Sequence, residues 1–404
     1  MQWNDLPQQA RRTLEQLEQA GFEAALVGGC VRDRLMGRTP GDYDIATSAS
    51  PEQMQAVFAG EKLLLTGLRH GTVTLLREGM PLEITAFRLD GAYSDMRRPD
   101  SVRFTRSLRE DVLRRDFTMN ALAWELRAGL IDHTGGQEDI LRRRIRAVGE
   151  PGRRFTEDAL RILRAVRFAA QLSFDIEPDT ERALFLLHGH VAHVAAERVR
   201  VELEKTLLGP AAAPVLRRYG EILRPRLPGA EALSAAQWEE SALRVQALQP
   251  FAGGRALLLW AALLLPLGSE KATEALAALR ADKVTIRGVQ KRLEMAAQPA
   301  ETLYALRCMA GDNGLQAARE AVLLRCAFCE PERSAALALL DRITREELPC
   351  SLAQLAVGGD ELLAAGASGR QVGALLHALL DAVRAERLPN RKDALLAEAK
   401  RLLL

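Results

Sequence analysis

The chain carries the stretch Val27-Gly28-Gly29-Cys30-Val31-Arg32-Asp33 and, shortly after it, Gly41-Asp42-Tyr43-Asp44. In an extended strand alternate side chains share a face, so Asp42 and Asp44 are expected to point the same way. Two neighbouring carboxylates repel each other unless a cation lies between them. Because Mg²⁺ takes oxygen ligands and commonly shares them with substrate phosphates, the pair predicts a magnesium site. The alternative interpretation is a solvated acidic turn.

The residues before this acidic pair offer a place for phosphate groups. Ala24–Val27 reads as a short buried strand and Gly28-Gly29 as a tight turn. A helix is expected over Val31–Met36, stopped at Gly37. Backbone N–H groups at its start, together with Arg32, favour an anion. A Gly-Gly turn alone is a weak signal, but in combination with the acidic pair it predicts a triphosphate held beside the metal ligands.

A third acid is expected near the pair. The segments Gly71–Leu76 and Leu82–Phe87 read as the two strands of a hairpin with a turn at Glu78-Gly79. On the second strand, Glu83 and Thr85 share one face, because side chains alternate along a strand. Glu83 is therefore a candidate third carboxylate for the metal site.

Two helix starts are marked by their capping residues. Ser50, Pro51 and Gln53 predict a capping box with proline at the first helical position. Ser107 with Glu110 predicts a second helix, which we expect to run on through Asn120.

The composition suits a large protein with reduced cysteines. At 404 residues the chain should hold roughly two to four domains. The net charge of +2 is nearly balanced, so nucleic-acid contacts must come from local basic patches, for which the candidates are Arg142-Arg143-Arg144, Arg153-Arg154 and Arg217-Arg218. Five scattered cysteines indicate a reducing compartment. We therefore expect a cytoplasmic protein.

No membrane contact is expected. The segment Met1–Gln19 is polar and does not read as a signal peptide, and the apolar run Ala256–Leu267 is too short to cross a bilayer. That run should be a buried helix. From about Leu141 onward strand signals vanish and Leu, Ala, Arg and Glu dominate. The pattern predicts an α/β head followed by an all-helical body.

A second polar cluster lies on a predicted helix that Thr156 should cap. Arg161, Arg164 and Arg167 recur every three residues along it, and Asp158 is placed to orient Arg161. A carboxylate accepts from an exocyclic amino group and a guanidinium donates to ring nitrogens or carbonyl oxygens, so the pair could read cytosine and adenine alike. The alternative is a surface helix with ordinary ion pairs.

These motifs together resemble the tRNA nucleotidyltransferases that add or repair the 3′-terminal CCA, of the bacterial type whose head is related to DNA polymerase beta, and their poly(A) polymerase relatives. The resemblance covers roughly the first half of the chain, to about Leu207. The matching segments are Val27–Asp33, Gly41–Asp44, the loop Arg88–Pro99, Arg114–Asn120 and Glu157–Arg161.

The resemblance implies a role for each of ten residues. Asp42 and Asp44 would be magnesium ligands, and Glu83 the third catalytic carboxylate. Asp158 and Arg161 would be the amino-acid template that reads the base. The remaining nucleotide contacts would come from Gly29, Arg32, Arg115, Arg164 and Arg167.

The resemblance also implies an α+β multidomain fold, with a polymerase-beta-like nucleotidyltransferase head of mixed sheet and helices followed by an all-α neck, body and tail. The expected boundaries are 1–140 for the catalytic head, 141–208 for the base-recognising neck, 209–310 for the body and 311–404 for the tail, the last two binding tRNA. The implied reaction is template-independent addition of CCA to tRNA, recognised by its acceptor arm and 3′ end, from CTP and ATP by a two-metal mechanism that releases pyrophosphate. A homodimer is compatible with it.

Two alternatives stay open: addition of the final A only, and poly(A) polymerase activity. Enzymes that add only CC tend to lack the loop pattern that Arg88–Pro99 retains, which argues against that subset. The remaining candidate ligands, Cys326 with Cys329 and the histidines at 188, 190 and 193, lack partners at metal-ligand spacing and are expected to be structural.

Overall fold

The computed structural model describes residues 6–91 and 102–404. Contacts divide the chain into two units, Met1–Ala211 and Ala212–Leu404, and each is described by itself. The main strands of the first unit are β1 (Ala24–Val27), β2 (Asp44–Thr47), β3 (Lys62–Leu64), β4 (Thr72–Arg77), β5 (Met80–Ala86), β8 (Leu122–Glu125) and β9 (Gly129–Asp132).

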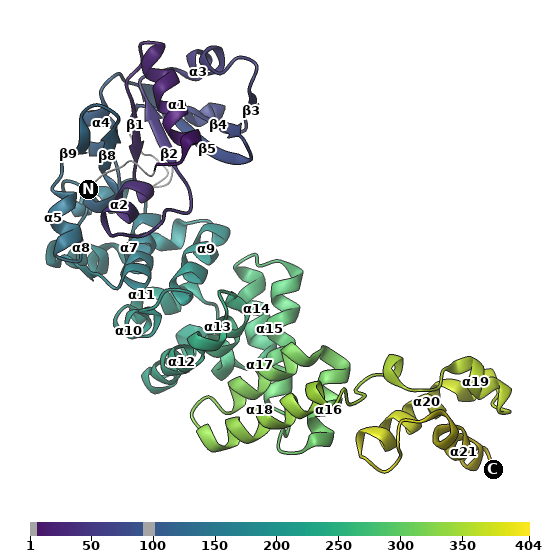
Figure 1. Cartoon of the computed structure of the whole chain (residues 1–404). Coiled ribbons are helices and arrows are strands. Elements are labelled where there is room, and N and C mark those ends of the chain that lie inside the picture. Colours follow the sequence, from purple (N-terminus) through teal and green to yellow (C-terminus); the bar gives the residue numbers. More distant parts are fainter. Residues whose placement is uncertain (1–5, 92–101) are drawn as a thin grey trace. The chain divides into compact units, whose positions relative to one another are not determined.

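In the described part of the first unit these strands form one mixed sheet in the order β3-β4-β5-β2-β1-β8-β9 (Figure 1). β2 and β5 run parallel, while the other neighbouring strands run antiparallel. The central strands are apolar, and Leu26, Ile45 and Ile84 are fully buried. The sheet confirms the predicted mixed α/β head.

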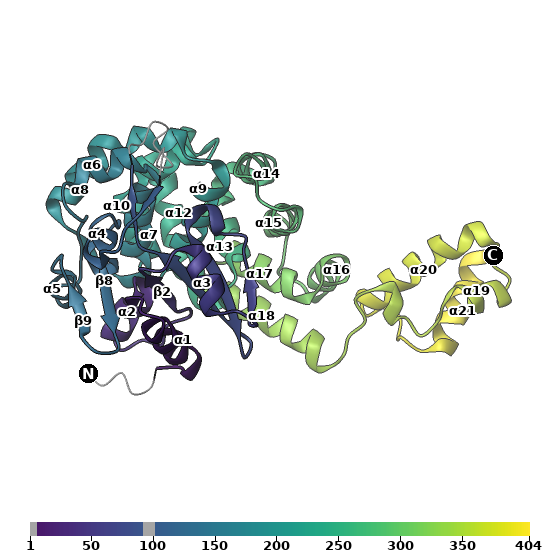
Figure 2. The same ribbon diagram turned by 90° about the horizontal axis from the view of Figure 1, so that it is seen from above.

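Helices cover the sheet and continue beyond it. α1 and α3 contact each other (Figure 2). α1 packs on β1, and α3 packs on β4. The helices of this unit are α1 (Gln8–Gln19), α2 (Gly29–Leu35), α3 (Pro51–Val57), α4 (Leu108–Leu113), α5 (Gly136–Leu141), α6 (Pro151–Glu157), α7 (Leu160–Leu172), α8 (Pro178–Leu187) and α9 (Ala196–Leu207). Two small sheets join β6 (Arg88–Asp90) to β7 (Val102–Phe104) and β10 (Arg144–Ile145) to β11 (Asp175–Ile176).

Several local predictions are confirmed. Ser50 and Gln53 form the capping box at the start of α3, with Pro51 in its first turn. The β4–β5 hairpin turns at Glu78 and Gly79, which both have positive φ, as a tight hairpin turn requires.

The helix that starts at Ser107 is shorter than predicted. α4 ends at Leu113, and only Thr118–Asn120 form a further single turn of 3₁₀ helix. The reason is Asp116, whose carboxylate accepts the Phe117 N–H at 2.8 Å and so competes with a continuous helix.

The predicted helix capped by Thr156 is also wrong at its start. Thr156 lies within α6, and its hydroxyl donates to the Gly152 carbonyl. Asp158 is extended and interrupts the helix, and its carboxylate accepts the Leu160 N–H at the start of α7. The prediction that strands vanish after Leu141 misses the short β10–β11 pair.

The second unit is helical in the residues described. Its helices are α10 (Ala212–Arg218), α11 (Gly220–Leu223), α12 (Ala235–Leu248), α13 (Ala256–Leu264), α14 (Gly268–Ala278), α15 (Lys283–Ala296), α16 (Leu303–Asn313), α17 (Leu315–Arg325), α18 (Glu330–Arg345), α19 (Gly359–Ala364), α20 (Gly369–Arg384) and α21 (Lys392–Leu403). The stretch Ala256–Ala278 is long and apolar enough to cross a membrane by length and composition alone. However, a 3₁₀ turn at Leu265–Leu267 separates α13 from α14, and Leu258–Leu264 are buried in the protein core.

Candidate active site

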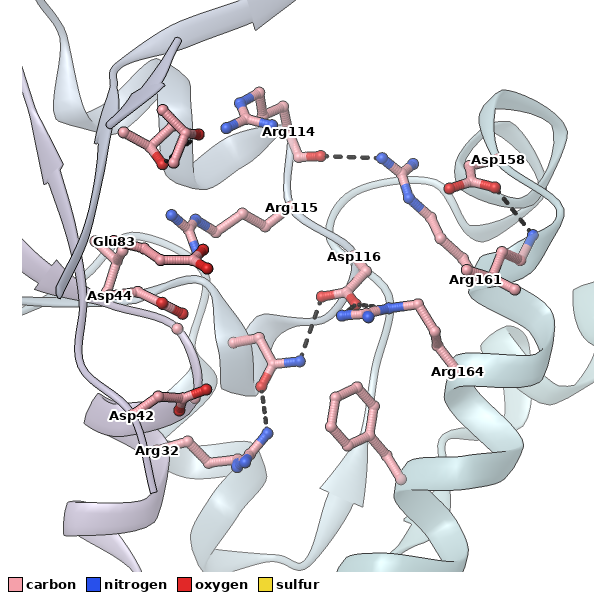
Figure 3. Close-up of a pocket in the computed structure, with 18 of the residues that line it drawn as sticks. Arg32, Asp42, Asp44, Glu83, Arg114, Arg115, Asp116, Asp158, Arg161 and Arg164 are labelled. Carbon is pink, nitrogen blue, oxygen red and sulfur yellow. Dashed lines mark hydrogen bonds and ion pairs between the residues drawn. The ribbon is translucent and has the colours of Figure 1, made fainter. Parts of the chain in front are cut away.

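The first unit contains a pocket of about 560 Å³ between the sheet and α7 (Figure 3). Its walls come from α2, β2, β5, the segment after α4, α7 and α9. All ten residues that the sequence singled out line it: Gly29, Arg32, Asp42, Asp44, Glu83, Arg115, Asp158, Arg161, Arg164 and Arg167.

Three carboxylates lie at one end of the pocket (Figure 3). Asp44 opens β2, Asp42 lies just before the strand, and Glu83 is the parallel-register neighbour of Asp44 on β5. Burial and the negative charges of Asp42 and Glu83 raise the pKa of Asp44 to about 6, against a smaller opposing effect of Arg115. The site therefore carries excess negative charge that a cation would relieve.

These acids do not form a complete metal cage by themselves. In residues 6–91 and 102–404 no group of three or more His, Cys, Asp or Glu side chains is placed to hold an ion. Their carboxylate oxygens fit a hard divalent cation that takes its remaining oxygen ligands from a substrate. The donor set thus suits a hard divalent cation, and Mg²⁺ stays a prediction.

Gly28 allows the chain to pass close to Arg115. It has φ +74°, and a Cβ at this position would lie 3.0 Å from Nη1 of Arg115. Arg115 itself donates from Nη2 to the buried Asp111 at 3.1 Å, while its buried Nε has no hydrogen-bond partner among the described residues. This arginine thus retains hydrogen-bonding capacity beside the acidic end of the pocket.

A chain of polar contacts crosses the floor of the pocket from α2 to α7 (Figure 3). Arg32 donates to Oδ1 of Asn120 at 2.7 Å, and Asn120 donates to Asp116 at 3.3 Å. Arg164 donates to Oδ2 of Asp116 from Nε at 2.7 Å and from Nη2 at 2.6 Å. Burial alone would raise the pKa of Asp116, but Arg164 and the hydrogen bonds lower it to about 2. Asp116 is therefore a buried anion that joins the two sides.

The expected pairing of Asp158 with Arg161 is wrong. Arg161 donates to Glu157 at 2.7 Å, whereas the Asp158 carboxylate accepts from Arg198 of α9 at 3.0 Å. The extended backbone of Asp158 turns its side chain away from the helical position that the prediction assumed. Both side chains still face the pocket.

The structure adds residues to which the sequence had assigned no role. Asp116 and Asn120 belong to the matching motif Arg114–Asn120, and that membership was the signal that could have found them. Arg198 and Glu202 share a face of α9, where Glu202 accepts from Arg167 at 2.6 Å. Their spacing of one helical turn was visible, but their partners, Asp158 before α7 and Arg167 on α7, were not.

The remaining candidates lie elsewhere or are only partly described. Arg88 lines the pocket, while most of the loop Arg88–Pro99 lies outside the described residues. The basic patches are partly paired, as in the contacts Arg142–Glu138, Arg154–Glu157 and Arg217–Glu239. The structural interpretation of Cys326 with Cys329 and of the three histidines stays a prediction.

Comparison with known proteins gives matches along most of the chain. Residues 24–146 match a family model described as "Poly A polymerase head domain". Residues 173–230 match "Probable RNA and SrmB- binding site of polymerase A", and residues 256–399 match "tRNA nucleotidyltransferase domain 2 putative".

Curated relatives and solved structures agree with these models. A CCA-adding enzyme of Geobacillus thermodenitrificans is 51% identical over 223 residues, an alignment that spans 55% of each chain. A CCA-adding enzyme of Levilactobacillus brevis is 37% identical over 98% of this chain and 99% of its own. The crystal structure of the Bacillus stearothermophilus CCA-adding enzyme in complex with CTP superposes with a TM-score of 0.83 at 36% identity, covering 98% and 97% of the two chains.

A more distant structure, the Thermotoga maritima CCA-adding enzyme complexed with tRNA, shares the fold with a TM-score of 0.71 at 22% identity, over 98% of this chain and 95% of its own. Similarity along nearly the whole of both chains, as in the Levilactobacillus brevis relative, shows that this protein is a nucleotidyltransferase that belongs to the family of CCA-adding enzymes.

Proposed function

We propose that the protein adds the 3′-terminal CCA to tRNA from CTP and ATP and releases pyrophosphate. The observation that carries this proposal is a single pocket with Asp42, Asp44 and Glu83 at one end and Asp158 with Arg161 at the other. Such a pocket can hold the triphosphate of one nucleotide at the acids and its base at the helical side. The crystal structure of the Bacillus stearothermophilus relative in complex with CTP supports the choice of nucleotide.

For the cation we propose Mg²⁺, with Asp42 and Asp44 as ligands and Glu83 as a third carboxylate beside them. The chemistry that Mg²⁺ supplies when bound is acidification of the attacking 3′-hydroxyl and neutralisation of the leaving pyrophosphate. No side chain of the pocket needs to act as a nucleophile, because the RNA hydroxyl attacks the α-phosphorus directly.

The basic side chains would bind and orient the nucleotide. Arg32 and Arg115 are proposed to contact the triphosphate, with Gly29 allowing close approach of the backbone. The position of Arg115 on the pocket wall that also carries Asp44 and Glu83 supports this role, since a guanidinium there can donate to phosphate oxygens.

Base selection is proposed for Asp158 and Arg161. Cytosine and adenine both carry an amino group that can donate a hydrogen bond to the Asp158 carboxylate. Uracil and guanine carry a carbonyl oxygen at that position instead. The contact with Arg198 uses Oδ2 of Asp158, so the carboxylate keeps further acceptor positions. Arg161 would donate to the ring nitrogen or carbonyl oxygen of the same edge.

Recognition of tRNA is proposed to involve the second, helical unit, and the division into head, neck, body and tail stays a proposal. The complex of the Thermotoga maritima enzyme with tRNA supports the choice of partner. Contacts to phosphates should dominate, so affinity should fall steeply with salt. We also propose a cytoplasmic location, with which a tRNA substrate is consistent.

The test is extension of three tRNAs, lacking CCA, lacking only the final A, and complete, with CTP, ATP or both. We expect three added nucleotides on the first, one on the second and none on the third. Extension of only the second tRNA would reassign the protein to A addition, and long A tails would reassign it to poly(A) synthesis.

A further inference from the structure

The ring of Phe168 lies under three arginines of the pocket, which we call the arginine cluster. The guanidinium carbons of Arg32, Arg164 and Arg167 lie 5.2, 5.5 and 3.9 Å from its centroid. All three distances fall within the range of cation–π attraction, which extends to about 6 Å. The ring is buried, and Phe117 packs edge-on against it with centroids 5.8 Å apart. Phe168 is thus a fixed contact shared by three cations from two helices, α2 and α7.

Like charges so close together repel, and each member of the cluster also has a carboxylate. The three acids come from different parts of the unit: Asp33 for Arg32, Asp116 for Arg164 and Glu202 for Arg167. These partners neutralise charge, and the hydrogen bond from Asn120 to Asp116 also links Arg32 to Arg164. The Phe168 ring is a contact that all three guanidinium groups share, Arg167 included.

The two kinds of partner differ in their effect on hydrogen-bond donors. A carboxylate holds a guanidinium by accepting its N–H groups, whereas an aromatic face holds it through the cation and uses no donor. Arg167 donates from Nε to Glu202 and from Nη1 to Gln171, and no hydrogen bond of its Nη2 is found among the described residues. Arg164 similarly uses only Nε and Nη2 on Asp116. The ring therefore positions the cluster while donors stay available to a ligand.

We propose that Phe168 is a positioning residue of the nucleotide site, whose ring aligns the arginine cluster to bind one nucleoside triphosphate. This inference rests on the proposed function, because it concerns the same pocket. Phe168 itself does not touch the reacting atoms. Its loss should weaken nucleotide binding more than it slows the chemical step, and it should affect CTP and ATP alike because the ring does not contact the base-reading pair.

The test compares Phe168→Leu, which stays apolar, with Phe168→Tyr, which keeps the ring. The matched control is Phe174→Leu, since Phe174 is also buried and lies under Arg143 at 5.7 Å but does not line the pocket. Steady-state kinetics should show KM for CTP and for ATP raised about tenfold or more in Phe168→Leu, with kcat within about threefold. Phe168→Tyr and Phe174→Leu should keep KM near that of the wild type.

Unchanged KM values in Phe168→Leu would overturn the inference, and so would equal increases in Phe168→Tyr or in Phe174→Leu. Thermal denaturation shows whether each variant is folded. A partly misfolded variant would have a smaller active fraction, which lowers the apparent kcat but does not raise KM. Calorimetric titration with CTP and Mg²⁺ distinguishes this inference from the proposed function. If the wild-type protein extended no tRNA, the function would fail, while a weaker CTP affinity in Phe168→Leu would still support the role of the ring. Equal CTP affinities would refute that role even in an active enzyme.

Discussion

Replacing Asp116 by Asn should destabilise the first unit strongly, because this buried carboxylate balances Arg164. The pKa of Asp116 is lowered from 3.8 to about 2, which corresponds to a stabilisation of roughly 2–3 kcal/mol at neutral pH. The variant also leaves the Arg164 side chain, which is 33% exposed, without its anion, so this loss should cost less than the value of about 3–5 kcal/mol that is typical of a fully buried pair. We therefore expect the free energy of unfolding to fall by about 3 kcal/mol, and Tm by roughly 6–12 °C.

The contribution of Asp116 to the free energy of unfolding should also depend on pH. A carboxylate with a lowered folded-state pKa contributes stability that is complete above its unfolded value and is lost as the pH falls through the folded value. The wild type should therefore lose this contribution between about pH 4 and pH 2, and Asp116→Asn should lack that part of the acid dependence.

The assay is chemical and thermal denaturation of the full chain, followed at several pH values. Asp179→Asn is the matched control, because the Asp179–Arg182 pair is exposed and should contribute less than about 1 kcal/mol. If Asp116→Asn were as stable as that control, or kept the acid dependence of the wild type, the reasoning about a buried balancing charge would be refuted.

Three further changes test other parts of the account. Asp158→Ala should relax discrimination against UTP and GTP more than it weakens triphosphate binding, and unchanged discrimination in misincorporation assays would remove Asp158 from base selection. Gly28→Ala should cost about 1–3 kcal/mol in backbone strain and weaken CTP binding by displacing a nearby arginine, whereas Gly37→Ala, with φ +71° but open space around it, should leave CTP binding unchanged in titrations. Burial, together with Glu23 and Glu18, raises the pKa of Glu125 to about 7, so the free energy of unfolding should fall as the pH rises from about 4.5 to 7. Glu125→Gln should flatten that fall by roughly 1 kcal/mol, allowing for partial exposure, and an unaltered pH profile of Tm would contradict this.

Local periodicity and turn chemistry were sufficient to predict the acidic end of the pocket. Asp42 and Asp44 flank the start of a strand whose parallel neighbour presents Glu83, and alternation along each strand placed all three on one side. The capping box at Ser50 and the turn at Glu78-Gly79 were equally visible, because each depends on residues close together in the chain.

Contacts between distant segments were not predictable in the same way. Asp158 was paired with Arg161 on helical spacing, but its partner is Arg198, 40 residues further along on another helix. The early end of α4 depends on Asp116, whose competing hydrogen bonds and distant partner Arg164 outweigh helix propensity. The cation–π contacts of Phe168 likewise required the fold, since one of the arginines lies on α2.

The central claim is that the acids beside β2 direct a nucleoside triphosphate onto an RNA terminus. The most direct measurement is single-turnover extension of tRNA lacking CCA by the wild type, Asp42→Ala and Asp44→Asn, with tRNA affinity measured in parallel. We expect a product three nucleotides longer for the wild type, and no product for either variant despite nearly unchanged tRNA binding. Extension at the wild-type rate by either variant would contradict it.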